Sequence, residues 1–447
     1  MMKRRTFLGG TAAAAALASC KDGSDTGELA EAGIDHVIVI MMENRSFDHF
    51  LGALAMEGMP VEGLTGDESN PDSSGVDHPV FHMDETCQLD PPHGWNDSHS
   101  QFNGGLNDGF VLEHEDRVGM TQGPWVMGYY TREDLPAHYA LADDFCVPDQ
   151  FFCSVMSSTW PNRFYGHTGS SKGIRNNDLP EDGNGIYDQK SIYQALAEAG
   201  LDWHYYYTDV PFIGLLHNHW DAERIDLIED FFRDVEAGKL PEFTWIDPGF
   251  TWNDDHPPHH IGAGQMFLAL AIEALARSPL WDRCLIVITY DEHGGFFDHV
   301  APPLVEDDYA DTGFDQLGFR VPALVVGPWV KKGVVSEVFD NTSVLKYVCD
   351  RFGIEPWTTR IATANSIGLC LDEDRMASGE PLPPPTIPAF SAPGFEQLPE
   401  ECLYRSEPGG QPELEAWVAE NMPETARYDL ADAKAFFDAK AREYGLL

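Results

Sequence analysis

Two short apolar runs stand out along the chain, and each ends in a pair of polar side chains. The run IDHVIVIMM is followed by Glu43 and Asn44. The run CLIVITY is followed by Asp291 and Glu292. Both runs are rich in Val and Ile and do not alternate with polar residues, which is typical of strands covered on both faces of a parallel sheet. In such sheets ligands bind at the carboxyl ends of the strands, so we expect the four side chains that follow these two strands to meet at one site.

Elsewhere the apolar pattern takes the period of helices. It predicts an amphipathic helix over residues 265–277 and another around Cys349, and Ser46 is placed to cap a short helix. Buried strands mixed with amphipathic helices indicate an α/β fold. No linker or internal repeat interrupts the chain, so we expect one domain over residues 21–447, with the Pro-rich segment 376–415 as a surface excursion.

The first twenty residues have the pattern of an export signal. The stretch KRRTFL precedes an Ala-rich apolar run too short to span a membrane, and LASC ends at Cys20 like a lipobox. We therefore expect residues 1–20 to be a twin-arginine lipoprotein signal, with the mature protein extracytoplasmic and anchored to a membrane by lipid on Cys20. The alternative is a short hydrophobic N-terminal helix.

Charge and cysteine content limit the partners and the disulfides that we expect. Acidic residues outnumber basic ones 74 to 28, for a net charge of −46, and they are spread along the whole chain. A polyanion repels nucleic acid, so no nucleic-acid partner is expected. The acidic surface fits either a high-salt habitat or an ordinary acidic secreted protein. Apart from Cys20 there are seven cysteines, so at least one stays unpaired, and Cys146 and Cys153 could form a disulfide.

Three further segments carry candidate chemistry. His93 lies in the loop sequence DPPHGW, and His256 lies in NDDHPPHH, where acidic and imidazole groups could act as acid and base. The third segment, SSTWPNR, places Thr159 at a turn and Arg163 four residues later. A hydroxyl becomes a nucleophile only when a base or metal activates it, and an arginine can hold phosphoryl oxygens in a fork.

The segment TYDEHGGFFDHVAPP has the most specific pattern. A buried strand that ends in Asp291 and Glu292 puts two carboxylates at the sheet edge, and the following glycines leave room for a ligand to approach the backbone. Desolvated carboxylates are costly without partners and usually serve as ligands or acid/base groups.

Taken in order, the blocks VIVIMMENRSFDHFLG, DPPHGW, SSTWPNR, NDDHPPHH and TYDEHGGFFDHVAPP resemble the bacterial phosphoesterase family of phosphatidylcholine-type phospholipases C and related acid phosphatases. The resemblance runs from about Ile34 to Ile354 and implies an alkaline-phosphatase-like α/β/α sandwich around a mixed, largely parallel sheet. It also implies that Thr159 is the nucleophile and that His93 and His256 surround the phosphate. The metal ligands that it implies are Glu43, Asn44, Asp291 and Glu292.

The chain departs from the family pattern in two places. Where the family has Asp-His-Thr-Ser, this chain has Asn341 in place of the histidine. A further family histidine pair would come from His204, His217 and His219, and no motif selects among them.

These observations predict a phosphoric ester hydrolase. A divalent cation, identity open among calcium, magnesium, manganese and zinc, would activate Thr159, and His256 or His93 would protonate the departing alcohol. The expected substrate is a phosphatidylcholine-type phospholipid, which makes the protein a phospholipase C, and the alternative is an acid phosphatase acting on small phosphoesters. A non-catalytic phosphate- or metal-binding lipoprotein is the alternative of another class. Sulfate-ester hydrolysis ranks low, because no Cys-x-Pro-x-Arg run is present.

Overall fold

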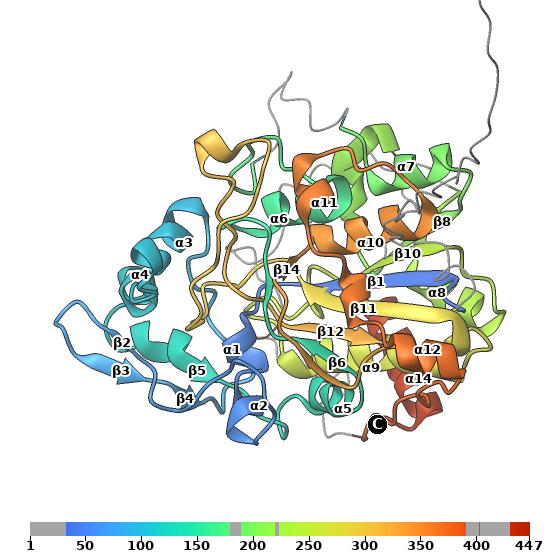
Figure 1. The fold of residues 1–447 in the computed structure, drawn as a ribbon. Helices are drawn as coiled ribbons and strands as arrows, with labels where there is room; N and C mark the ends of the chain where they lie inside the picture. Colours follow the sequence, from blue (N-terminus) through green and yellow to red (C-terminus); the bar gives the residue numbers. More distant parts are fainter. Residues whose placement is uncertain (1–32, 179–188, 220–222, 390–401, 403–429) are drawn as a thin grey trace, which may run out of the picture.

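An eight-stranded sheet forms the centre of the protein. The computed structural model describes residues 33–178, 189–219, 223–389, 402 and 430–447. The strands lie in the order β13-β6-β12-β11-β1-β10-β8-β9 (Figure 1). Their bounds are β1 (His36–Met42), β6 (Cys146–Pro148), β8 (Trp203–Tyr207), β9 (Ile225–Leu227), β10 (Phe243–Asp247), β11 (Cys284–Tyr290), β12 (Ala323–Val326) and β13 (Gly333–Val335).

The sheet is mixed but mostly parallel, as the sequence predicts. Strand β1 pairs in parallel with both β10 and β11, and β8 pairs in parallel with β10 and β9. Strand β12 is antiparallel to its neighbours β11 and β6, and β13 pairs in parallel with β6. The α/β class is therefore confirmed.

The two apolar runs form adjacent central strands. In the register of β1 and β11, Met42 lies opposite Tyr290, and every residue of β11 is buried. Both strands consequently end at the same level, and the polar residues that follow them leave the sheet side by side. The expected convergence of strand ends is thus built into the pairing of β1 with β11.

Helices cover both faces of the sheet (Figure 1). One layer contains α6, α7 and α10, and the other contains α5, α8, α9 and α14, whose members contact one another within each layer. Their bounds are α5 (Pro136–Asp144), α6 (Thr159–Thr168), α7 (Ile192–Glu198), α8 (Ile228–Glu236), α9 (Ile261–Arg277), α10 (Thr342–Phe352) and α14 (Leu430–Tyr444). The helices predicted over 265–277 and around Cys349 are confirmed as α9 and α10.

A lobe of short elements lies beside the carboxyl ends of the central strands, at the left of Figure 1. It has its own apolar cluster, in which Phe110 and Val126 of the lobe pack with Phe297 and Phe319, which follow β11 in the chain. The lobe contains β2 (Ser69–Pro71), β3 (Asp77–Pro79), β4 (Phe81–His82), β5 (Gly128–Tyr129), α3 (Trp95–Phe102), α4 (Phe110–Val118) and the 3-10 helices η2 (Asn103–Gly105) and η3 (Gly123–Met127). The shared cluster fixes the lobe against the loops that leave the sheet.

The remaining elements are short connectors. They are α1 (Phe47–Phe50), α2 (Ala53–Met56), β7 (Phe151–Phe152), β14 (Phe339–Asp340), α11 (Thr359–Thr363), α12 (Glu373–Ser378) and the 3-10 helices η4 (Phe212–His219), η5 (Trp281–Arg283), η6 (Ala310–Thr312) and η7 (Ile367–Cys370). Helix α1 begins where the sequence predicts, because the Ser46 side chain accepts a hydrogen bond from the backbone amide of His49.

Two local expectations are wrong. Thr159 does not stand in a turn but begins α6, since Pro161 falls in the first helical turn, where its missing N–H costs nothing. Cys146 and Cys153 are free and buried, and the disulfide joins Cys87 to Cys402 instead, across 315 residues. Pairing over such a distance depends on tertiary structure and leaves no signal in local spacing.

Several expectations concern residues outside the described ranges. The predicted signal peptide, Cys20 and most of the 376–415 excursion lie there, and the described residues 379–389 have no regular secondary structure. Among the described residues, no helix has both the length and the apolarity needed to cross a membrane.

Candidate active site

The two polar pairs that follow β1 and β11 meet in the interior. The backbone amide of Asn44 donates to Asp291 Oδ1 (3.1 Å), and the Asn44 side-chain amide donates to Glu292 Oε1 (2.8 Å). Asn44 adopts a left-handed backbone conformation (φ 70°), which asparagine tolerates better than most residues. Glu43, Asn44, Asp291 and Glu292 are all fully buried. The structure therefore brings together the four residues that the sequence assigns to one cation site.

The two glycines after Glu292 allow this close approach. A Cβ on Gly294 would lie 2.2 Å from the Asn44 carbonyl oxygen, and a Cβ on Gly295 would lie 2.5 Å from the Pro92 carbonyl oxygen. Both glycines also have positive φ angles (68° and 72°). The space that we expected them to leave for a ligand is used by the chain itself, which packs Asn44 and the His93 loop against the end of β11.

Thr159 faces this cluster from the first turn of α6. Its hydroxyl Oγ1 donates a hydrogen bond to Glu43 Oε1 at 2.9 Å, and its side chain is fully buried. The amino-terminal end of a helix carries a partial positive charge, which favours an anion placed there. The candidate nucleophile thus stands between a carboxylate and an anion-stabilising helix end.

Arg163 lies one turn further along α6 and contacts two of the buried carboxylates. Its Nε donates to Asp291 Oδ2 (2.9 Å) and its Nη1 donates to Asp247 Oδ1 (2.9 Å), while Nη2 points at the carbonyl oxygens of Met41 and Met42. The sequence predicts a fork on phosphoryl oxygens, whereas in the structure these donors hold Asp291 and the end of β1. Arg163 is therefore a positioning residue for Glu43, Asn44, Asp291 and Glu292, which we call the strand-end cluster.

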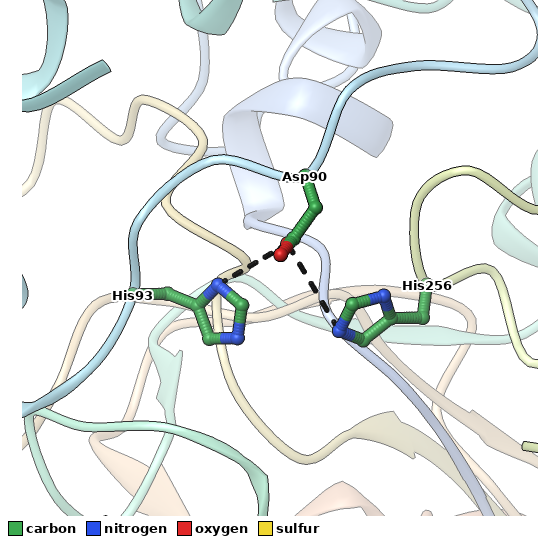
Figure 2. A group of neighbouring side chains, drawn as sticks. All are labelled: Asp90, His93 and His256. Carbon is green, nitrogen blue, oxygen red and sulfur yellow. Dashed lines mark ion pairs between the residues drawn. The ribbon is translucent and has the colours of Figure 1, made fainter. Parts of the chain in front are cut away.

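A second group lies on the side of the lobe, formed by Asp90, His93 and His256 (Figure 2). Asp90 Oδ1 is 3.4 Å from His93 Nδ1 and 4.0 Å from His256 Nε2, and the two imidazole centroids are 5.7 Å apart. His93 Nε2 lies 3.2 Å from Asn44 Nδ2 and 3.8 Å from Glu292 Oε1. The predicted histidines therefore border the strand-end cluster, and Asp90 lies between them.

Burial makes the strand-end cluster electrostatically unfavourable without a cation. It raises the pKa of Glu43 well above its usual value, and the neighbouring Asp291 and Asp254 raise it further. Burial also raises the pKa of Glu292 to about 8 although His93 opposes the shift, and it raises the pKa of Asp291 against the effect of Arg163. Removing these carboxylates from water costs free energy that a bound cation would offset.

The pKa values of His93 and His256 shift in opposite directions, although the two side chains are neighbours. Burial lowers the pKa of His93, but Glu292 and Asp90 outweigh this effect and raise it to about 9. Burial and the neighbouring His93 lower the pKa of His256 well below its usual value. At neutral pH one imidazole of the pair therefore carries a proton that offsets the nearby carboxylates, and the other is neutral.

The donor set fits a divalent cation. Asn44 Oδ1 is buried and accepts no hydrogen bond from the residues that the structure describes, which leaves an amide oxygen for a ligand bond. The other three residues supply carboxylates, and an all-oxygen set suits calcium, magnesium or manganese better than a thiolate-bound metal. The residues present thus match the cation that the sequence implies.

Three further residues belong to the site: the sequence pointed to Asp254 only as one of the acidic groups next to His256, and it gave Asp247 and Asn341 no role. Asp254 accepts a hydrogen bond from His259 Nδ1 (2.5 Å), and its carbonyl oxygen accepts from the Glu43 amide (2.9 Å). Asp247 anchors Arg163, and Asn341 donates from Nδ2 to the Asp291 carbonyl oxygen (3.4 Å). The position of Asp247 at the end of β10, next to β1, was a usable signal, because the strand-edge argument applies to it equally.

The additional histidine expected from the middle of the chain is not identified. His204 lies on β8 and pairs with Asp226 at 2.8 Å. The side chains of His217 and His219 lie outside the described residues.

A buried hydroxyl at a helix end, held against a cluster of carboxylates, is the arrangement that a phosphoester hydrolase with a hydroxyl nucleophile needs, and here it stands on an α/β fold. The chain belongs to the Phosphoesterase family, whose family model matches residues 34–355. This confirms the resemblance on which the site assignment was based.

Several curated relatives carry phospholipase names. The chain is 36% identical over 335 residues to Non-specific phospholipase C1 of Arabidopsis thaliana, covering 68% of this chain and 62% of that protein. It is 33% identical over 389 residues to Phospholipase C B of Mycobacterium tuberculosis, covering 72% of this chain and 74% of that protein. Among solved structures, a phosphonate monoester hydrolase of Agrobacterium radiobacter matches 75% of this chain and 77% of its own length with 11% identity and a TM-score of 0.39, too distant to bear on the site.

Proposed function

We propose that the protein is a divalent-cation-dependent phospholipase C that cleaves phosphatidylcholine-type lipids through a phosphothreonine intermediate. The observation that carries the proposal is the 2.9 Å hydrogen bond from Thr159 Oγ1 to Glu43 Oε1, inside a site that also gathers Asn44, Asp291 and Glu292. The phospholipase names of the relatives support a lipid substrate over a small phosphomonoester.

The cation would be held by the strand-end cluster of Glu43, Asn44, Asp291 and Glu292. When bound, it would lower the pKa of the nucleophile and neutralise charge on a phosphoryl oxygen. The protein prepares this site by holding Asp291 with Arg163 and with the Asn44 amide, so that the carboxylate is fixed before substrate arrives.

Thr159 would carry the first chemical step. Its hydroxyl is oriented by Glu43, which accepts the proton as the Thr159 oxygen attacks phosphorus in line with the bond to the leaving alcohol. The bond from Oγ1 to phosphorus forms while the phosphorus–alcohol oxygen bond breaks, and the products are phosphothreonine and the alkoxide of diacylglycerol. The end of α6 stabilises the negative charge that collects on the phosphoryl group.

His93 and His256 border the cluster on the side of the lobe, where the leaving oxygen would lie. The departing alkoxide needs positive charge or a proton at its oxygen, and these are the groups placed to provide it. In the second step the imidazole that gave up its proton takes one from a water molecule, which attacks phosphorus from the vacated side, breaks the bond to Thr159 and releases the phosphorylated headgroup. Thr159 recovers its proton from Glu43.

The leader sequence supports an extracytoplasmic, membrane-attached location for this activity. The twin-arginine pattern and Cys20 support export of the folded enzyme and attachment to a membrane by lipid, which would place the site near its substrate. A Cys20→Ala variant would then be recovered in the soluble extracytoplasmic fraction, while the unaltered protein stays with membranes. Equal recovery of both proteins in the soluble fraction would contradict the anchor.

The function is tested with three substrates: phosphatidylcholine, p-nitrophenylphosphorylcholine and p-nitrophenyl phosphate, each with EDTA or added divalent cations. We expect the choline diesters to be preferred, EDTA to abolish turnover, and Thr159→Ala to reduce turnover by about 10³-fold or more. The exposed Thr121 provides the matched control, and Thr121→Ala should keep full activity. Unchanged turnover in Thr159→Ala would contradict the mechanism, and a preference for the monoester would indicate an acid phosphatase. No turnover of any substrate under any condition would indicate a binding protein.

A further inference from the structure

We propose that Asn176 and Asn177, two consecutive residues in the loop after α6, hold the nucleophile and the leaving-group side of the active site in fixed positions relative to each other. Their side chains cap two different helices, one on each side of the site. The inference rests on the proposed function, because it makes both asparagines positioning residues for the groups that this function uses. We call residues 174–177 the capping loop.

Asn177 caps α6, the helix that begins with Thr159. Ser158, the residue before the helix, makes no capping hydrogen bond with its side chain. Instead, Asn177 Oδ1 accepts a hydrogen bond from the backbone N–H of Trp160 at 2.8 Å. Trp160 is the second helical residue, and its N–H is a usual partner of a capping side chain. A loop outside the helix therefore fixes the turn that carries the Thr159 hydroxyl.

Asn176 caps α3, the helix of the lobe that follows His93. The N-cap residue of α3 is Gly94, which has no side chain to cap the helix. Asn176 Oδ1 accepts a hydrogen bond from the backbone N–H of Trp95, the first helical residue, at 2.9 Å. His93 is only two residues before Trp95 in the chain. Asn176 therefore holds the histidine loop at the point where it enters α3.

The capping loop is itself attached to both helix starts. Ile174 is buried in the same apolar cluster as Trp160 of α6. The Ser157 hydroxyl, just before α6, donates a hydrogen bond to the Arg175 carbonyl oxygen. On the other side, the Arg175 guanidinium lies over the Trp95 ring of α3, 4.5 Å from its centroid. The loop thus contacts each helix start more than once, so it links the position of one to that of the other.

This link matters for a reaction in which two groups act at opposite ends of one phosphorus atom. The attacking oxygen belongs to Thr159, and the departing alkoxide would lie on the side of His93. In-line displacement needs both sides aligned, and a misplacement of about 1 Å can lower the rate by about 100-fold. Asn176 is exposed, so its replacement should leave the protein folded. A rate change in such a variant would therefore report the position of the histidine loop.

The test compares two choline esters that differ in the leaving group. p-Nitrophenolate leaves without a proton, whereas the alkoxide released from a water-soluble short-chain phosphatidylcholine needs one. In Asn176→Ala we expect kcat/KM, which reports the step in which the alcohol leaves, to fall about 10-fold on the lipid and less than about 2-fold on p-nitrophenylphosphorylcholine. In Asn177→Ala, which disturbs the nucleophile, kcat/KM should fall about 10-fold on both substrates.

Two further variants separate position from folding. Asn176→Asp keeps an oxygen that can accept the Trp95 N–H and should restore the wild-type ratio of the two substrates. Asn96→Ala removes an exposed asparagine from the first turn of α3 and, as the matched control, should behave as wild type. Circular dichroism and urea denaturation check the fold of each variant. If Asn177→Ala does not fold, the two variants at Asn176 decide the result.

Equal losses on both substrates in Asn176→Ala would overturn the proposal, as would wild-type kinetics in either folded alanine variant. A failure of Asn176→Asp to restore the substrate ratio would overturn it as well. Thr159→Ala tests the proposed function separately, because turnover that survives in this variant contradicts the function, whereas the substrate ratio in Asn176→Ala decides the role of the capping loop. No turnover of either ester by the wild-type protein would refute the function and the positioning role together.

Discussion

The strand-end cluster and the cluster of Asp90, His93 and His256 differ in how the protein holds them in place. Residues of the first leave two hydrogen-bonded central strands in register, and buried Arg163 ties Asp291 to Asp247. Residues of the second come from loops, one of them attached to the C-terminal segment by the disulfide at Cys87. The comparison teaches that the sheet makes the first cluster rigid, while the second depends on long-range links outside the sheet.

The largest effect should follow a change in the strand-end cluster. Asp291→Asn removes a carboxylate that pairs with Arg163 and faces the cation site. We expect turnover to fall by about 10³-fold or more on every substrate while circular dichroism shows an intact fold. Wild-type rates in this variant would show that the site has been assigned to the wrong residues.

Breaking the disulfide should act on the loop cluster and leave the strand ends in place. In Cys402→Ser, the free energy of unfolding should fall by about 2 to 4 kcal/mol, as measured by urea denaturation. The imidazole NMR signals of His93 and His256 should broaden, while magnesium binding at the strand-end cluster should change little. Dithiothreitol should reproduce both effects in the wild-type protein and add nothing in the variant, and a loss of magnesium binding as large as that in Asp291→Asn would refute the comparison.

Gly294 tests the close packing at the end of β11. In Gly294→Ala the new methyl group would meet the Asn44 carbonyl oxygen, so we expect a stability loss of about 1 to 3 kcal/mol and weaker cation binding. Gly75→Ala is the matched control, since Gly75 also has a positive φ (82°) but has nothing within 4 Å of the added carbon. If the two variants lose equal stability in thermal melts, the positive φ alone explains why residue 294 is a glycine, and close packing against Asn44 does not contribute.

The smallest effect concerns pH in the EDTA-treated protein. Between about pH 7.5 and 9, above the range where the buried histidines with lowered pKa values titrate in the unfolded chain, the raised pKa of His93, about 9, and of Glu292, about 8, mean that the folded state binds more protons than the unfolded state. The stability they contribute is present at the lower pH and is lost as the pH rises, so the melting temperature should drop by roughly a few degrees over this window. Added cation should reverse the trend, because it binds the deprotonated ligands. A melting temperature that rises with pH in the metal-free protein would contradict these assignments.

The comparison also explains what the sequence could predict. The strand-end cluster was predictable because an uninterrupted apolar run indicates a central strand, and the carboxyl ends of parallel strands share an edge. The cap at Ser46 and helix α9 followed from local pattern in the same way. The role of Asp90, the disulfide at Cys87 and the pairing of Arg163 with Asp247 could not be predicted, since each depends on which distant loops the folded chain brings together.

The central claim is that Thr159 attacks phosphorus and carries the phosphoryl group. It is tested most directly by quenching the enzyme with acid during turnover of p-nitrophenylphosphorylcholine and analysing its peptides by mass spectrometry. The account predicts a phosphorylcholine adduct on the peptide that contains Thr159, absent from Thr159→Ala and from the EDTA-treated protein. Rapid turnover with an adduct on a different residue, or with the same adduct formed in Thr159→Ala, would contradict it.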